Sequence, residues 1–492
     1  MAGLGSKIKH VVVLMLENRS FDNVLGRLYP NRADFNGLSG TESNPCHDPA
    51  TGRLLAPVPV WNDPTLAPDA MTVPSPDPGE RFDDINRQLF GLSGQPSAAT
   101  PPPMTGFVDN YLRQYKPPTP GDYAASPYLA RAAMHHYLPQ QVPALSSLAR
   151  AFAVSDQWHA SAPNQTWPNR FFVHTGTARG YVNNSPAHFP YEMPTVFDRL
   201  QAKGLDWAIF FHDVPQALTL LRLQSHPDHF HRFDEFLRAT EAGLLPAYSF
   251  IEPHYLGELG ILLPNDQHPP HNVALGDQLI ARVYNALRKN EAAWRQTLLI
   301  VTYDEHGGCY DHAPPPRAVS PDDYRDPSGF AFDRYGVRVP AVIASPYVEA
   351  ESMLRAAPDG LPHQGPPYPF DHTSIIKTLR LCFDLGPKLT NRDDVAPDLD
   401  RALTLDQPTN LGPETIAALP YVPTAPILQD ALTRPLNDMQ AALHGLAGLL
   451  PAAGQDPVKH ATTLPPPPDA PNTAGEALAE IKNGLARFFG TD

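Results

Sequence analysis

Two polar clusters far apart in the chain have the composition of a site for a hard metal cation. Glu17 and Asn18 directly follow the apolar run Val11–Leu16, and Asp304 and Glu305 follow a second apolar run and precede two glycines. Carboxylate and carboxamide oxygens suit Ca²⁺, Mg²⁺ or Mn²⁺, and a nearby imidazole extends the choice to Zn²⁺ or iron. Because adjacent acids after an apolar strand are costly to bury without a counter-charge, we expect a divalent cation between these clusters.

A third segment, SAPNQTWPNRFFVHTGT at 161–177, supplies a candidate nucleophile. Ser161 and Thr166 both precede the Pro-Asn-Arg turn that ends in Asn169 and Arg170. A hydroxyl just before a helix start can attack an ester when a metal and backbone N–H groups stabilise its alkoxide. A threonine before a turn is more often only a helix cap, so the interpretation of this segment as a source of the nucleophile depends on the other clusters.

Three histidines are candidates for proton transfer or for binding an anionic group. His268 and His271 lie in the Pro-rich segment NDQHPPHN, and His312 ends the segment DEHGGCYDH. An imidazole titrates near neutral pH and can protonate a leaving oxygen. Single histidines are more often structural, so the sequence alone leaves both interpretations open.

The elements that must position these residues are buried strands alternating with helices. Apolar runs predict strands at Val11–Leu16, Phe152–Val154, Trp207–Phe211, Tyr248–Ile251, Thr297–Tyr303 and Val339–Ala344. Leu279, Val283 and Leu287 share one helical face, and a helix begins after FDHTS with Thr373 or Ser374 as its cap. This alternation predicts an α/β fold, a mostly parallel central sheet between helices. In such sheets ligands bind beyond the carboxyl ends of the strands, where the polar clusters stand.

The distribution of proline suggests how the chain is divided. The 492 residues include 59 prolines, which cannot lie in helix interiors or central strands. We expect residues 1–400 to form a catalytic domain, with a Pro-rich insertion at about 45–105 that passes over the site or forms a lid. Residues 401–492 are predicted to be a Pro/Ala-rich extension with short helices.

Charge and cysteine content exclude several classes of function. Lys and Arg number 37 and Asp and Glu 52, a net charge of −15, which disfavours a nucleic-acid partner or a broad anionic membrane surface. Three scattered cysteines form neither a disulfide framework nor a thiolate metal site. No signal peptide and no apolar run of about 18 residues is seen, so we expect no stable membrane insertion. The location expected is cytoplasmic, or outside the cell by a non-classical route.

The motifs, in the order in which they occur along the chain, resemble those of the phosphoesterase family. That family comprises bacterial phospholipases C, plant non-specific phospholipases C and related acid phosphatases, within the alkaline phosphatase-like superfamily. The resemblance extends over residues 8–385 and rests on ENRSFD, TWPNR and DEHGGCYDH, supported by YGVRVPAVIASPYV and FDHTS. It implies the same α/β sandwich that the strand pattern predicts.

The resemblance also implies roles for individual residues. Glu17, Asn18, Asp304 and Glu305 would bind the metal, and Thr166 would become a covalent phosphothreonine. His271 and His312 would act in catalysis by binding phosphoryl oxygens or protonating the leaving group. Asn169 and Arg170 would shape the turn and, with His268, bind the substrate. The chain departs from the family at Asp77-Pro78-Gly79-Glu80, where many phospholipases C have Asp-Pro-x-His.

The implied activity is metal-dependent hydrolysis of phosphate esters, most simply phospholipase C-type cleavage of diesters. A phosphomonoesterase of the acid phosphatase type is the alternative, and a non-catalytic relative is a third interpretation. A sulfatase needs a modifiable Cys or Ser where this chain has Thr166. An acidic, aromatic-lined mouth would suit choline or ethanolamine headgroups, with Trp158, Trp167 and FPYEMP as candidate lining.

Overall fold

An eight-stranded sheet forms the centre of the computed structural model, which describes residues 3–96, 101–115, 127–258, 260–356 and 368–491. The strand order is β11-β4-β10-β9-β1-β8-β6-β7. The middle strands β1 and β9 are seven residues long and buried except for His10, because they consist mainly of Val, Leu, Ile and other apolar residues. The bounds are β1 His10–Leu16, β4 Ala153–Ser155, β6 Trp207–Phe211, β7 Phe230–Arg232, β8 Tyr248–Glu252, β9 Thr297–Tyr303, β10 Ala341–Ala344 and β11 Ser352–Met353.

The sheet is mostly parallel, as the sequence predicted. All six predicted strands belong to it, displaced by no more than two residues at either end. β10 is the exception in direction, because it runs antiparallel to both β9 and β4. The short outer strands β7 and β11 had no recognisable pattern in the sequence.

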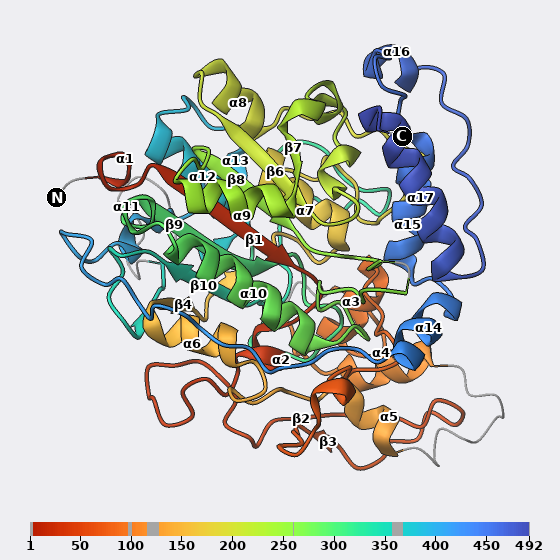
Figure 1. Cartoon of the computed structure of the whole chain (residues 1–492). Coiled ribbons are helices and arrows are strands. Elements are labelled where there is room, and N and C mark those ends of the chain that lie inside the picture. Colours follow the sequence, from red (N-terminus) through yellow and green to blue (C-terminus); the bar gives the residue numbers. More distant parts are fainter. Residues whose placement is uncertain (1–2, 97–100, 116–126, 259, 357–367, 492) are drawn as a thin grey trace.

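Helices cover both faces of the sheet (Figure 1). One group packs together through α10: α6 Pro143–Ala151, α9 Phe233–Ala242 and α10 Val273–Arg288. A second group packs together through α7: α7 Thr166–Thr175, α8 Val196–Ala202 and α12 Thr373–Phe383. The fold is therefore the predicted α/β sandwich. The predicted cap of α12 is wrong: Thr373 is already its first residue, and no side chain caps it.

The Pro-rich insertion forms small elements with a hydrophobic cluster of their own. Its elements are β2 Ser43–Asn44, β3 Val58–Pro59, η1 Pro68–Ala70 and α3 Phe82–Phe90, followed by α4 Phe107–Gln114. Val58, Ile85, Leu89 and Val108 belong to this second cluster. The segment before α3 crosses the carboxyl ends of the central strands, as the contacts of Glu80 described below show. Residues 97–100 lie outside the described residues.

The C-terminal extension packs against the main body. Its helices are α14 Ala425–Thr433, α15 Asp438–Leu449, α16 Pro457–Ala461 and α17 Ala474–Phe489. Met439, Leu443 and Phe488 join the same hydrophobic core as the central strands. Figure 1 shows these helices in blue along one side of the molecule. The division of the chain near residue 400 stays a prediction.

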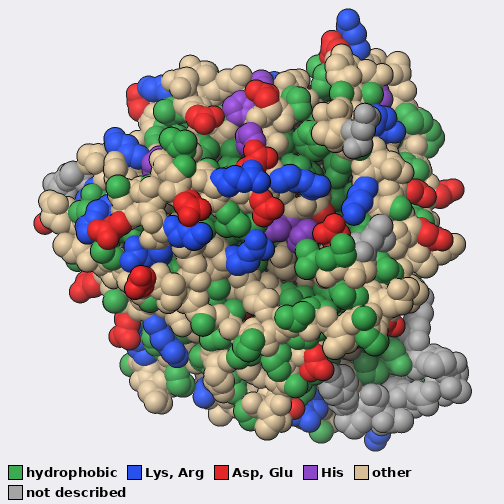
Figure 2. Space-filling view, in the orientation of Figure 1, with side chains coloured by type: hydrophobic (Ala, Val, Ile, Leu, Met, Phe, Trp, Pro, Cys, Tyr) green, Lys and Arg blue, Asp and Glu red, His purple; other side chains and the backbone are tan. Residues whose placement is uncertain are grey.

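Two surface properties complete the description. On the face shown in Figure 2, basic and acidic side chains lie interspersed. Within the described residues, no helix combines the length and the apolar character needed to cross a bilayer.

The turn after β9 leaves no space for a side chain, and this yields a first prediction. Gly307 has φ +58°, and a Cβ atom there would lie 2.3 Å from the carbonyl oxygen of Asn18. Gly204 also has positive φ, +70°, but nothing lies within 4 Å of its Cβ position. Gly204→Ala should therefore cost only the left-handed backbone strain, roughly 1–2 kcal/mol. Gly307→Ala should cost clearly more, as thermal unfolding of the two variants will show. Equal losses of stability in the two variants would mean that the turn adjusts to the added Cβ atom at no cost in free energy.

Candidate active site

Two neighbouring parallel strands bring the two polar clusters together. In the register of β1 and β9, Leu16 lies opposite Tyr303, and the N–H of Asp304 donates to the carbonyl of Leu16 (3.2 Å). Both strands end at the same level, so the residues that follow them must meet. The backbone then turns sharply at Asn18, whose φ of +57° is a conformation that asparagine tolerates better than most residues.

Asn18 is the centre of the resulting cluster. Its N–H donates to Asp304 Oδ1 (3.1 Å), and its Nδ2 donates to Glu305 Oε1 (2.7 Å) and to Glu80 Oε2. Its Oδ1 accepts from Thr166 Oγ1 at 3.5 Å. All these residues are buried. The structure thus places the predicted nucleophile and three of the four predicted metal ligands in direct or shared contact.

Thr166 is the first residue of α7, so its hydroxyl lies at the positive end of a ten-residue helix. Asn169 lies one turn further on and supports the loop before the helix, because its Nδ2 donates to the carbonyl of Asn164 (2.7 Å). Ser161, the other candidate hydroxyl, accepts the N–H of His372 (3.2 Å) and has no described contact with Asn18.

Arg170 joins the ends of three strands. Its Nε donates to Asp304 Oδ2 (3.2 Å), its Nη2 donates to Glu17 Oε1 (3.3 Å), and its Nη1 lies 4.0 Å from Glu252 Oε2. Glu17 is therefore linked to Asp304 through Arg170, and it also accepts from Gln216 Nε2 (2.5 Å). The second oxygen of Glu17 is buried without a hydrogen-bond partner.

The site has more buried negative than positive charge. Five buried carboxylates, those of Glu17, Glu80, Glu252, Asp304 and Glu305, surround two cationic groups, Arg170 and His268. Burial raises the pKa of Glu305 well above its ordinary value, and the carboxylates of Glu80 and Asp304 raise it further. Burial and Asp304 do the same to Glu17. With all five ionised the excess is three negative charges, so the donor set and the unpaired Glu17 oxygen fit a divalent cation.

His268 reaches the cluster through Glu80. Its Nε2 lies 3.4 Å from Glu80 Oε2, and its Nδ1 lies 3.7 Å from Asp77 Oδ1. Burial opposes a charge on the ring, but Asp77 and Glu80 raise the pKa of His268 well above its ordinary value.

The other two predicted histidines lie further out. His271 Nδ1 donates to Asp266 Oδ1 (2.7 Å), and the ring centre of His271 lies 5.8 Å from that of His268. His312 contacts Asp22 Oδ2 (2.6 Å), and within the described residues no contact links it to Asn18 or Thr166.

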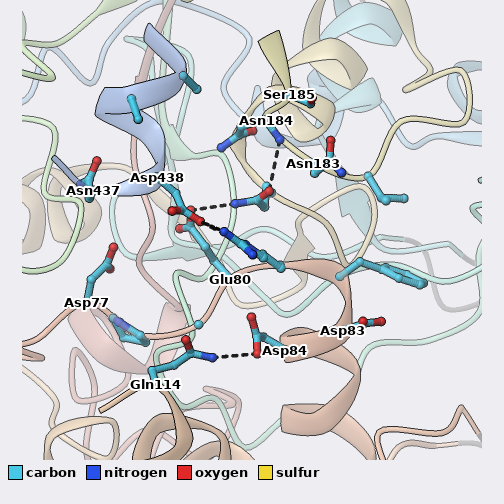
Figure 3. A pocket seen from close by; sticks show the side chains of 18 of the residues that line it. Asp77, Glu80, Asp83, Asp84, Gln114, Asn183, Asn184, Ser185, Asn437 and Asp438 are labelled. Atoms are coloured by element: carbon cyan, nitrogen blue, oxygen red, sulfur yellow. Dashed lines mark hydrogen bonds and ion pairs between the residues drawn. The ribbon is translucent and has the colours of Figure 1, made fainter. Parts of the chain in front are cut away.

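A cavity of about 1160 Å³ opens beside the cluster (Figure 3). Glu80 and Gln165 belong to its wall and are hydrogen-bonded to each other (3.1 Å). Because Glu80 also contacts Asn18, only this side chain separates the cavity from Asn18. Across the mouth, Arg81 pairs with Asp438 at the start of α15 (2.6 Å). Most charged lining residues are acidic: Asp77, Glu80, Asp83, Asp84, Asp326 and Asp438, against Arg81 and Arg87.

Comparison with known proteins identifies the family. Residues 8–386 match the sequence profile of the phosphoesterase family. The chain belongs to the phosphoesterase family. As such it is a hydrolase that acts on phosphate-ester bonds.

Similar proteins come from plants and bacteria. The phosphoesterase is 35% identical to non-specific phospholipase C1 of Arabidopsis thaliana over 422 residues, 83% of this chain and 73% of the relative. It is 28% identical to phospholipase C A of Mycobacterium tuberculosis over 472 residues, 85% of this chain and 82% of the relative. A solved phosphonate monoester hydrolase of Agrobacterium radiobacter matches 55% of this chain and 73% of its own, with 16% identity and a TM-score of 0.33.

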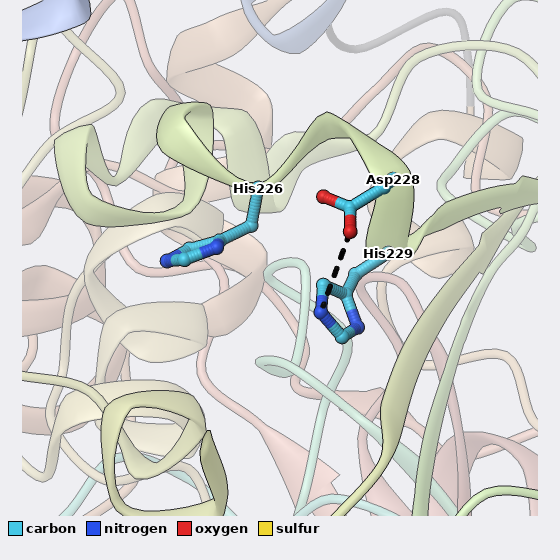
Figure 4. A group of neighbouring side chains, drawn as sticks. All are labelled: His226, Asp228 and His229. Carbon is cyan, nitrogen blue, oxygen red and sulfur yellow. Dashed lines mark ion pairs between the residues drawn. The ribbon is translucent and has the colours of Figure 1, made fainter. Parts of the chain in front are cut away.

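Two other groups of potential metal-binding side chains occur among the described residues of the phosphoesterase. In the first, the acids Asp22 and Asp311 already pair with the buried Arg338 (3.1 and 3.0 Å), and His312 completes the network. The second is His226, Asp228 and His229 (Figure 4). There His229 stacks on Trp207, the first residue of β6, so this group lies near the amino end of the strand, away from the cluster.

Several residues of the phosphoesterase site were missing from the sequence prediction. Glu252 ends β8 as Glu17 follows β1, so the rule of polar residues at strand ends would have found it. Glu80 had a signal as well, because it stands where the family motif expects histidine. Gln165, which contacts Glu80, and Gln216, which contacts Glu17, had none.

The bridging role of Arg170 leads to a second prediction. Arg170→Met should lower the stability of the phosphoesterase by roughly 3–5 kcal/mol, because it leaves Glu17 and Asp304 buried without their partner. Arg222 pairs with Glu192 (2.8 Å) but is exposed, so Arg222→Met should cost no more than about 1 kcal/mol. Thermal and urea unfolding, without added metal, will measure both. Similar losses for the two variants would contradict the proposed importance of the buried bridge.

Proposed function

We propose that this chain hydrolyses phosphodiesters by a phospholipase C-type reaction through a phosphothreonine at Thr166. The observation that carries the proposal is the position of Thr166: a buried hydroxyl at a helix N-terminus, directed at Asn18 within the cluster of acids. The curated relatives named above are phospholipases C, which supports the same activity.

In the proposed reaction, Thr166 Oγ1 gives up its proton to a water molecule and attacks phosphorus, and Asn18 Oδ1 orients the hydroxyl beforehand by accepting its hydrogen bond. The bond from phosphorus to the leaving oxygen breaks, and water later hydrolyses the phosphothreonine to restore the hydroxyl. The N-terminus of α7 attracts the phosphoryl oxygens. A divalent cation held by Asn18, Asp304 and Glu305, with Glu17 beside them, would lower the pKa of the hydroxyl and polarise the phosphoryl group.

The leaving oxygen needs a proton, and the imidazoles on the cavity side can supply it. Of the predicted histidines, His268 is the one that contacts the cluster, through Glu80. His271 lies beside His268, and Asp266 holds the Nδ1 of His271. His312 has no direct role in this proposal, because its contacts tie it to the buried pair of Asp22 and Arg338. Arg170 orients Asp304 and Glu17 and does not need to touch the substrate.

Removing the nucleophile gives a third prediction. Thr166→Ala should reduce turnover by orders of magnitude, while the loss of one long hydrogen bond should cost at most about 1 kcal/mol of stability. Ser161→Ala is the matched control and should keep its activity. Acid quenching of the wild type during turnover, followed by peptide mass spectrometry, should place a phosphate adduct on Thr166. An adduct on Ser161, or a fully active Thr166→Ala, would overturn the assignment.

The acidic cavity supports a preference for substrates that carry a positive charge. Six acidic and two basic side chains line it, which favours a zwitterionic choline or ethanolamine group over an anionic lipid. The aromatic residues expected from the sequence, Trp158, Trp167 and those of FPYEMP, do not line this cavity, whereas Phe82 does. Trp158 and Trp167 are buried, and Trp158 stacks on Phe370. Charge, rather than cation–π contact, therefore supports this preference.

The fourth prediction compares two substrates with the same leaving group. Initial rates on p-nitrophenyl phosphorylcholine should exceed those on p-nitrophenyl phosphate, because the cavity attracts the ammonium group and repels the doubly charged monoester. The difference should shrink as salt is added, since the exposed acids of the cavity are then screened. A monoester preference of tenfold or more would make the protein a phosphatase of the acid phosphatase type.

A further inference from the structure

The Pro-rich insertion brings one carboxylate, that of Glu80, into the centre of the site. Its motif Asp77-Pro78-Gly79-Glu80 packs directly on the turn that follows Glu305. A Cβ atom at Gly308 would lie 2.6 Å from Pro78 Cβ and 2.8 Å from the carbonyl oxygen of Gly79. This close backbone contact fixes the position of Glu80, whose exposed fraction is only 4%.

The contacts of Glu80 are with the residues that would hold the cation. Its Oε2 accepts from Asn18 Nδ2, the same nitrogen that donates to Glu305 Oε1 (2.7 Å). Its Oε1 accepts from Gln165, the residue before the nucleophile (3.1 Å). The amide group of Asn18 therefore stands between two carboxylates, those of Glu80 and Glu305. A neutral N–H donor cannot balance two negative charges, so this position suits a cation.

A second observation on the cavity side also points to a missing partner. His268 is 1% exposed, and its Nδ1 contacts the carbonyl of Pro269 (2.7 Å). Its Nε2 has no hydrogen-bond partner, although it faces Glu80 Oε2 at 3.4 Å. A buried ring nitrogen without a partner is uncommon, because leaving it unpaired is costly. His268 Nε2 therefore lies at ion-pair distance from Glu80 but makes no hydrogen bond, and both groups face the same small region.

We propose that Glu80 is a further ligand of the divalent cation and makes the site selective for a hard cation, Mn²⁺ or Ca²⁺, over Zn²⁺. With Glu80, the carboxylate oxygens in contact with Asn18 are those of Glu80, Asp304 and Glu305, and the amide oxygen of Asn18 faces Thr166 beside them. Such a set suits Mn²⁺ and Ca²⁺, whereas a nitrogen donor at position 80 suits Zn²⁺. The inference rests on the proposed function, because it takes the cation site of Asn18, Asp304 and Glu305 as its base.

The experiment measures cation binding rather than turnover. The full chain is stripped with EDTA, and Mn²⁺, Ca²⁺ and Zn²⁺ are titrated by calorimetry, with melting temperatures recorded in parallel. The variants are Glu80→Gln, Glu80→His and Glu305→Gln. The control is Asp83→Asn, an exposed acid of the same cavity in α3. Gln keeps the shape of Glu80 and one of the two oxygens that accept from Asn18 and Gln165, and the melting temperature of the stripped variant checks its fold.

We expect Glu80→Gln to weaken Mn²⁺ and Ca²⁺ binding about tenfold or more, with a smaller effect on Zn²⁺. Glu80→His should shift the preference toward Zn²⁺, and Asp83→Asn should bind all three ions as the wild type does. Crystals soaked in Mn²⁺ should show an anomalous peak within roughly 2.0–2.6 Å of a Glu80 oxygen.

The results separate this inference from the proposed function. If Glu305→Gln loses the cation and Glu80→Gln binds as tightly as the wild type, Glu80 is not a ligand and only the inference fails. An equal loss in Asp83→Asn would show that the general charge of the cavity is responsible, which also overturns it. A wild type that binds none of the three ions would refute both the inference and the proposed metal dependence.

Discussion

One buried guanidinium holds the site together. Arg170 comes from α7, yet its three donor nitrogens face acids at the ends of β1, β8 and β9. Without it, those carboxylates would repel one another where three strands converge. Because Arg170 lies one helical turn beyond Thr166, the same interaction that balances the acids also fixes the start of α7 and the direction of the nucleophile. The position of the hydroxyl therefore depends on charge balance as much as on packing.

The sequence predicted the centre of the fold well and its periphery poorly. The long strands of Val, Leu and Ile were recognisable because burial on both faces leaves a continuous apolar run. The antiparallel direction of β10 was not, since the apolar pattern of a strand is the same in either direction. β7 and β11 have three and two residues and could not show a periodicity. The helix α15 was missed because residues 401–492 showed only a Pro/Ala-rich composition and one amphipathic segment.

The residues of the candidate site were also predicted only in part. Glu17, Asn18, Asp304 and Glu305 could be found because they directly follow predicted strands, and parallel strands of equal reach place their ends together. Thr166 and Arg170 came from a motif. Glu80 was marked only by its departure from the family motif, and Gln165 and Gln216 could not be assigned, because no local pattern reports which residues outside the strand ends reach the site. His312 illustrates the converse: it is near Asp304 in sequence, but the turn at Gly307 and Gly308 leads it toward Asp22.

The ion pair between Arg81 and Asp438 has a consequence for how such an enzyme can diversify. One side of the cavity belongs to the Pro-rich insertion and the other to α15, from a part of the chain that contributes nothing to the central strands. The insertion also supplies Glu80 to the reaction centre, whereas α15 reaches that centre only through Gln440, whose Nε2 lies 3.5 Å from His271 Nε2. Substitutions at Asp438 can therefore reshape the entrance without touching the acids, Arg170 or Thr166. Change in what the cavity admits is easier from the tail than from the insertion, whose residues also belong to the reaction centre.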